Sequence, residues 1–117
     1  MIDKLKYITE NGVDYPIAFT LIVMESIQDK YGSMDVWGNA IKPPDGKEPQ
    51  IKDVIWTFKE FINEGIDIEN EINGSDRKPI THKQAGRILS SIGLNKAGDI
   101  IGAITIQSMQ TEESKNE

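Results

Sequence analysis

The sequence predicts a mainly α fold: a compact helical domain of about five helices with an N-terminal β-hairpin. Three observations lead to this prediction. Apolar residues recur at helical spacing in several segments, of which residues 51–72 form the longest. Near the N-terminus, Asn11-Gly12 separates two segments of strand character, and this dipeptide is the strongest short-range hairpin signal. Glycines and capping residues divide the remainder into segments of helix length.

The length of the chain fits one domain. A chain of 117 residues can bury a core without covalent staples. We expect residues 1–110 to form this domain and residues 111–117, which contain no apolar side chain, to form a disordered polar tail. The sequence contains no cysteine, which excludes disulfides and thiolate metal sites.

The N-terminal elements follow from local signals. We predict strands over residues 4–9 and 13–19; Pro16 lacks a backbone donor, so the second strand must be an edge or be interrupted there. An isolated hairpin is marginal in water, so this one should lie on the helices. Helices are predicted over residues 20–31 and 34–41, and the proline-rich segment 42–49 is predicted to be a loop.

Residues 51–72 form the segment on which the other elements should pack. Its apolar stripe consists of Ile51, Val54, Ile55, Phe58 and Ile62. We expect Gly65 to end this helix and Asp67 to begin a short second one, which ends at Asn73-Gly74. Trp56 falls on the polar face, where an indole either packs under a neighbouring loop or contacts a partner.

Two further helices are predicted at the C-terminal end. Thr81 and Gln84 form a capping box, and the helix that they open ends at Gly93. The last helix, over residues 96–109, has two apolar sides. The main stripe contains Ala97, Ile100, Ile101 and Ile104, and the roughly opposite side contains Gly102, Ile106 and Met109. Such a helix is either enclosed within its own domain or offered to another chain.

The sequence contains no recognisable catalytic or metal-binding motif. The single histidine, His82, is expected to be an exposed residue at a helix start. Glu69, Glu71 and Asn73 match part of a calcium-binding loop, but its twelfth position would be Ile80, which cannot bind the ion. We therefore expect no catalytic residue, no metal, no cofactor and no enzyme activity. An enzyme would require a pocket that gathers His82 with acidic residues.

The net charge and the hydropathy of the sequence limit the cellular locations and the classes of partner that we expect. The net charge of -6 disfavours nucleic acid as a partner, because phosphate binding needs clustered lysine and arginine. The longest apolar runs are far shorter than the roughly 20 residues that a bilayer requires, so no membrane contact is expected. Residues 1–10 lack the apolar region of a signal peptide. We expect a cytoplasmic protein.

Protein binding is the remaining hypothesis. Trp56, Ile106 and Met109 lie off the core stripes, and apolar residues that gather on a surface form a patch of the kind that binds another protein. Packing within the domain is the alternative. The sequence leaves open whether the chain forms a homo-oligomer, for example through an unpaired hairpin edge.

A resemblance to a known family supports protein binding. It is carried by Tyr15-Pro16-Ile17-Ala18-Phe19, Tyr31-Gly32-Ser33, Ile55-Trp56-Thr57-Phe58, Asn63-Glu64-Gly65-Ile66-Asp67, Ile80-Thr81, Ala85-Gly86-Arg87-Ile88 and Ile92-Gly93. In this order the segments, within residues 5–109, resemble the small tail assembly chaperones of long-tailed phages and prophages of Gram-positive bacteria. The resemblance implies a small, acidic, helical, non-enzymatic protein of the bacterial host cytoplasm. It also implies binding to the tape-measure protein and recruitment of tail-tube subunits during tail morphogenesis.

A small helix-turn-helix DNA-binding regulator is the alternative function. Residues 81–109 contain two helices joined by a tight glycine turn, as that motif requires. The second helix should then carry cations that face DNA, but it offers only Lys96, with Asp99 beside it. The first helix adds Lys83 and Arg87.

Overall fold

The computed structural model describes the backbone of residues 5–116 and the side chains of residues 5–107. In this part of the chain, the predicted fold is confirmed: five α-helices follow an N-terminal hairpin. The elements are β1 (Lys6–Glu10), β2 (Val13–Ile17), α1 (Leu21–Tyr31), α2 (Met34–Ile41), the 3-10 turn η1 (Pro44–Gly46), α3 (Ile51–Asn73), α4 (His82–Ile92) and α5 (Leu94–Asn116).

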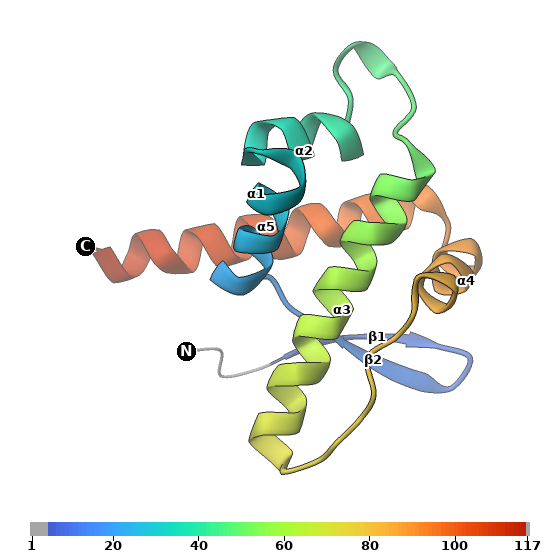
Figure 1. Cartoon of the computed structure of the whole chain (residues 1–117), viewed down its shortest axis with the longest axis vertical. Coiled ribbons are helices and arrows are strands. Elements are labelled where there is room, and N and C mark those ends of the chain that lie inside the picture. Colours follow the sequence, from blue (N-terminus) through green and yellow to red (C-terminus); the bar gives the residue numbers. More distant parts are fainter. Residues whose placement is uncertain (1–4, 117) are drawn as a thin grey trace.

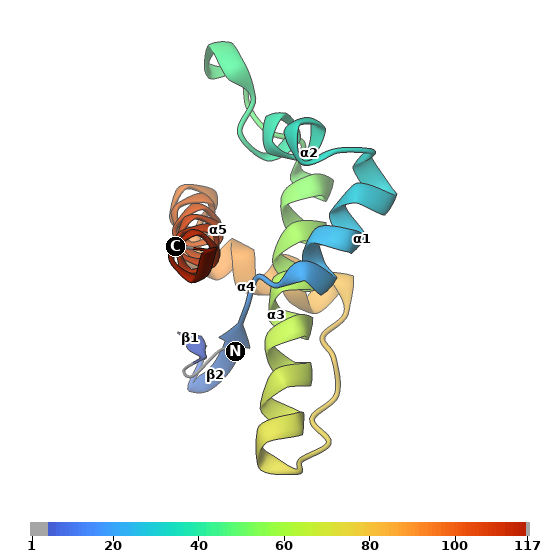
Figure 2. The same ribbon diagram turned by 90° about the vertical axis from the view of Figure 1, so that its left-hand side faces the viewer.

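Helix α3 is the central element, and the others are arranged around it. It runs along most of the long axis in Figure 1, below the loop that precedes it, with α1 and α2 at its N-terminal half and the hairpin and α4 along its side. Helix α5 crosses behind it. The view along α5 shows α1 and α5 on opposite sides of α3 (Figure 2).

The hairpin has the two-residue turn that Asn11-Gly12 predicts. Asn11 and Gly12 have φ of 52° and 77°, and Glu10 pairs with Val13 across the turn. Positive φ at both central residues matches the right-handed twist of the flanking strands. Strand β2 ends at Ile17 and not at residue 19, because the Ala18 N–H donates to the Phe61 carbonyl of α3 at 3.0 Å.

Gly65 does not end a helix, and this prediction was wrong. Helix α3 continues through it to Asn73, where Gly74 forms the left-handed cap with φ of 65°. Gly65 lies where the β2 backbone meets α3: a Cβ there would lie 2.5 Å from the Pro16 carbonyl carbon and 2.7 Å from the Ile17 nitrogen. The glycine serves close backbone approach and not chain reversal.

The core lies between α3 and every other helix. Its buried apolar members are Ile17, Phe19, Val23, Ile27, Trp37, Val54, Phe58, Phe61, Ile62, Ile66, Ile80, Ala85, Ile88, Leu89, Ala97, Ile101 and Ile104. Trp37 of α2 packs its ring near Phe19 and Phe61, and its Nε1–H donates to Thr57 Oγ1 at 2.9 Å. The predicted stripe residue Ile51 is 50% exposed, because it is the first residue of α3.

Two asparagines of α3 hold the segment that leads back to α4. Asn63 accepts from the Ile80 N–H at 2.7 Å and donates to the Ile80 carbonyl at 3.1 Å. Asn70 accepts from the Arg77 N–H at 3.0 Å and donates to the Arg77 carbonyl at 2.9 Å. Each amide thus pairs with one residue's backbone donor and acceptor, as a neighbouring strand would.

Helix α4 begins and ends as predicted, whereas α5 begins two residues earlier than predicted, at Leu94, and ends later. The capping box is confirmed: the Gln84 N–H donates to Thr81 Oγ1 and the Thr81 N–H donates to Gln84 Oε1. Gly93, with φ of 89°, separates α4 from α5. Helix α5 runs to Asn116, past the predicted end near residue 109 and through most of the segment expected to be a disordered tail. Within residues 5–116, no helix combines the length and apolar composition needed to cross a membrane.

A polar contact joins the start of α1 to α3. Thr20 caps α1 by accepting from the Ile22 N–H at 3.2 Å, and its hydroxyl donates to the Glu64 carboxylate. Burial raises the pKa of Glu64, and the nearby Asp67 and Glu71 carboxylates raise it further, while the Thr20 hydrogen bond lowers it. The net shift is upward, so charge on Glu64 is disfavoured in the folded protein.

We predict that Gly65→Ala destabilises the fold by about 3 kcal/mol, because the added methyl would meet backbone atoms that cannot rotate away. Gly98→Ala is the matched control: it is also an α-helical glycine, but a Cβ there meets no atom within 4 Å. It should stabilise by about 0.5–1 kcal/mol. Chemical denaturation of both variants measures this, and equal effects would contradict the role assigned to Gly65.

We predict that Glu64→Gln gains stability relative to wild type as the pH rises from about 4 to 7. A carboxyl with a raised folded-state pKa binds its proton more readily in the native state, so its contribution to the free energy of unfolding falls as pH rises through that range. Glutamine keeps an acceptor for Thr20 without the charge. Thermal melts across this range, with the exposed Glu25→Gln as control, test it; a pH-independent difference for Glu64→Gln would refute the prediction.

Candidate functional site

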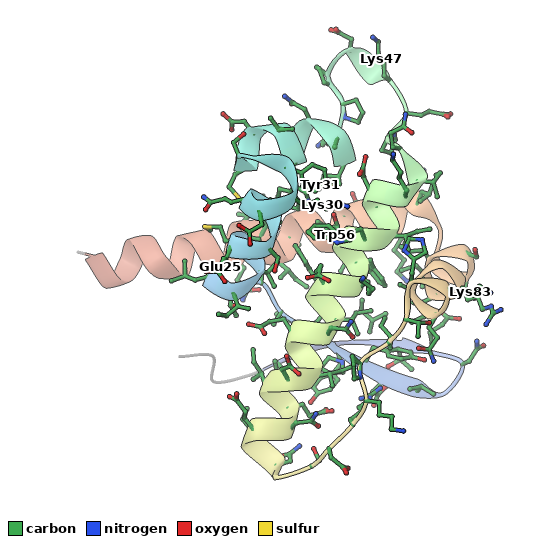
Figure 3. The ribbon with its side chains drawn as sticks, viewed as in Figure 1. Glu25, Lys30, Tyr31, Lys47, Trp56 and Lys83 are labelled. Atoms are coloured by element: carbon green, nitrogen blue, oxygen red, sulfur yellow. The ribbon has the colours of Figure 1, made fainter. Side chains whose placement is uncertain are left out.

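Trp56 packs against the end of α1 and not under a loop. Its ring meets Tyr31 edge to face, with centroids 5.6 Å apart and an interplanar angle of 72°. The Lys30 ammonium lies 5.2 Å from the Trp56 ring centroid and 5.9 Å from that of Tyr31. Figure 3 shows these three side chains together where α1 meets α3. Trp56 is half-buried, so part of the indole remains accessible.

The accessible part of Trp56 faces an open hollow of about 390 Å³. Three helices contribute to its walls: the last turn of α1, the first turns of α3 and the first residue of α4. The lining residues are Lys30, Tyr31, Lys52, Asp53, Trp56 and His82. We refer to this feature as the Trp56 hollow.

A hydrogen bond between two walls of the Trp56 hollow joins α1 to α3. The Tyr31 hydroxyl donates to Asp53 Oδ1 at 2.6 Å, and Asp53 is only 9% exposed. Burial, together with the Asp53 hydrogen bond and charge, raises the pKa of Tyr31 well above its ordinary value near 10. Tyr31 therefore stays neutral as a donor, and the Asp53 carboxylate is occupied within the protein.

The exposed charges at the Trp56 hollow are positive, although the chain as a whole is acidic. Lys30 and Lys52 are exposed, as is His82. Ion pairs in the described part of the chain join Lys59 to Glu60 and Arg77 to Glu69, and neither Lys30 nor Lys52 forms one. The two ammonium groups are thus available to an anionic group from outside the chain.

The Trp56 hollow gathers His82 and an acid, which is the arrangement that an enzyme would require. However, His82 is exposed, the Asp53 carboxylate accepts the Tyr31 hydrogen bond, and the lining contains no serine, threonine or cysteine. These groups can bind a ligand through charge and aromatic contact. Across the described residues, no three His, Cys, Asp or Glu side chains are grouped as a metal site.

The structure does not bring the predicted protein-binding residues onto one surface. Ile106 of α5 is 58% exposed, while Trp56 faces α1, and α1 and α5 lie on opposite sides of α3 (Figure 2). The side chain of Met109 lies outside the described residues. Trp56 and Ile106 therefore belong to two separate surfaces.

The sequence analysis did not identify four of the lining residues, Lys30, Tyr31, Lys52 and Asp53, as candidate site residues. Helical spacing could have identified two of them, because Lys52 and Asp53 precede Trp56 at i−4 and i−3 and so share its side of the helix. The contribution of Lys30, Tyr31 and His82 depends on how α1 and α4 pack on α3, which local spacing does not specify.

Comparison with known proteins adds no assignment. No protein-family model matches the sequence, and no curated protein or solved structure matches the chain.

Proposed function

We propose that this protein is a non-catalytic assembly chaperone that binds other polypeptides. The resemblance to phage tail assembly chaperones implies that the partners are the tape-measure protein and the tail-tube subunits. The observation that carries the proposal is the exposed Ile106 on α5, a helix whose C-terminal part extends away from the other elements (Figure 1).

Helix α5 uses its two apolar sides differently. Ala97, Ile101 and Ile104 are buried in the core, whereas Ile106 is exposed. Gly98 and Gly102 precede Ile106 at intervals of four residues, and a Cβ on either would meet no atom within 4 Å. The outer side of α5 therefore has no side-chain bulk at the two glycines and an apolar side chain at Ile106. This combination allows a partner helix to pack closely against it.

The net charge of the chain and the residues of its core are compatible with a chaperone role. A chaperone that holds long amphipathic helices must keep the complex soluble, and a net charge of -6 favours solubility. Several residues that carry the resemblance, among them Ile17, Phe19 and Phe58, lie in the core. This part of the resemblance therefore concerns residues that stabilise the fold.

We predict that Ile106→Asp reduces retention of a tape-measure fragment by about tenfold or more, because a charge would replace an apolar contact in the interface. The probe is a soluble fragment of the tape-measure protein encoded in the same genome, immobilised for a pull-down. Ile72→Asp is the matched control, since Ile72 is also an exposed helical isoleucine, 63% against 58% exposed, at the far end of α3.

Two outcomes would contradict the proposal. The first is equal retention of wild type, Ile106→Asp and Ile72→Asp, with all three shown to be folded by circular dichroism. The second is DNA binding in a gel shift at low salt that weakens steeply as salt is added, which would favour a helix-turn-helix regulator that uses α4 and α5.

A further inference from the structure

We infer that the Trp56 hollow is a second contact surface, which binds the carboxylate side chains of an acidic peptide segment. The inference goes beyond the proposed contact through α5 and rests on the proposed function only in taking the ligand to be a polypeptide. It is carried by the charges of the lining residues, by the position of Lys30 over the aromatic rings, and by the openness of the hollow.

Within residues 5–107, the ammonium groups of Lys30 and Lys52 are not neutralised by ion pairs, and that of Lys30 is held in place by aromatic rings. Lys30 is held over Trp56 and Tyr31 by cation–π contact, which limits the freedom of its ammonium group. Lys52, in the first turn of α3, also lines the hollow, and neither lysine pairs with a carboxylate among the residues described. Less side-chain entropy is lost on binding when a charged group is already oriented.

The one acid in the lining does not neutralise these lysines. Asp53 is 9% exposed and accepts the Tyr31 hydrogen bond, whereas Lys30 and Lys52 are exposed. An approaching group therefore meets ammonium donors first. His82, the first residue of α4, completes the polar rim.

The shape of the hollow favours a group carried by a larger chain. Sites for small molecules generally enclose most of the ligand, and this hollow is open to solvent. The Lys30 ammonium over Trp56 also occupies the position that a stacked planar ring would need. Carboxylates on a peptide need neither enclosure nor stacking, because the remainder of the peptide contacts the surrounding surface.

The two tryptophans allow a direct test by nuclear magnetic resonance. In the ¹⁵N-labelled protein, the Trp56 indole N–H reports on the hollow, and the Trp37 indole N–H, which donates to Thr57 in the core, serves as an internal reference. We expect hexaglutamate at low ionic strength to shift the Trp56 signal and not the Trp37 signal. Hexaglutamine, which is neutral, should shift neither.

Paired charge variants assign the response to the hollow. Lys30→Gln with Lys52→Gln should weaken hexaglutamate binding about tenfold, from the loss of two charge contacts. Lys47→Gln with Lys78→Gln removes the same charge from exposed loop positions and should change affinity less than about twofold. Lys47 lies far from Trp56 on the loop before α3 (Figure 3).

Three results would overturn the inference: no Trp56 shift with hexaglutamate, equal weakening in both double variants, or an equally strong response to inorganic phosphate. The last would make this a site for small anions and not for a peptide. Ile106→Asp should bind hexaglutamate as wild type does, so failure of this test is distinguishable from failure of the tape-measure pull-down.

Discussion

The close approach of the β2 backbone to α3 is the constraint on which the rest of the structure depends. Gly65 gives the strand access to the helix, and the Ala18 N–H then bonds to the Phe61 carbonyl at 3.0 Å. This contact ends the strand and directs the chain into α1 at Thr20, whose hydroxyl reaches Glu64 one turn from the Phe61 contact. The hairpin and α1 are thereby both attached to the same few residues of α3.

Local sequence signals predicted most of the elements, because those elements depend on local chemistry. Asn11-Gly12 adopts the positive φ angles of a hairpin turn, and Thr81 with Gln84 forms the capping box. Gly65 shows where local reasoning fails. A glycine after an apolar stripe is compatible with a helix end or with a close tertiary contact, and only the position of Pro16 and Ile17 in space separates the two.

The candidate sites were predicted only in part, for a similar reason. Helical spacing placed Trp56 outside the apolar stripe and Ile106 on the second side of the last helix. The neighbours that define the chemistry around Trp56 come from α1 and α4, and both Lys30 and His82 are 26 residues away from it in sequence. The amide pairing of Asn63 and Asn70 was equally invisible, since it matches two side chains with the backbone of a segment that has no regular structure.

Asn63 also contributes to holding the Trp56 hollow together. Ile80, bonded to Asn63, lies two residues before His82, so the wall from α4 is tethered to α3. The wall from α1 is tethered to the same helix by Tyr31 and Asp53, and α3 itself supplies the third. All three walls of the Trp56 hollow are therefore attached to α3, and the shape of the hollow around the indole depends on that one helix remaining folded.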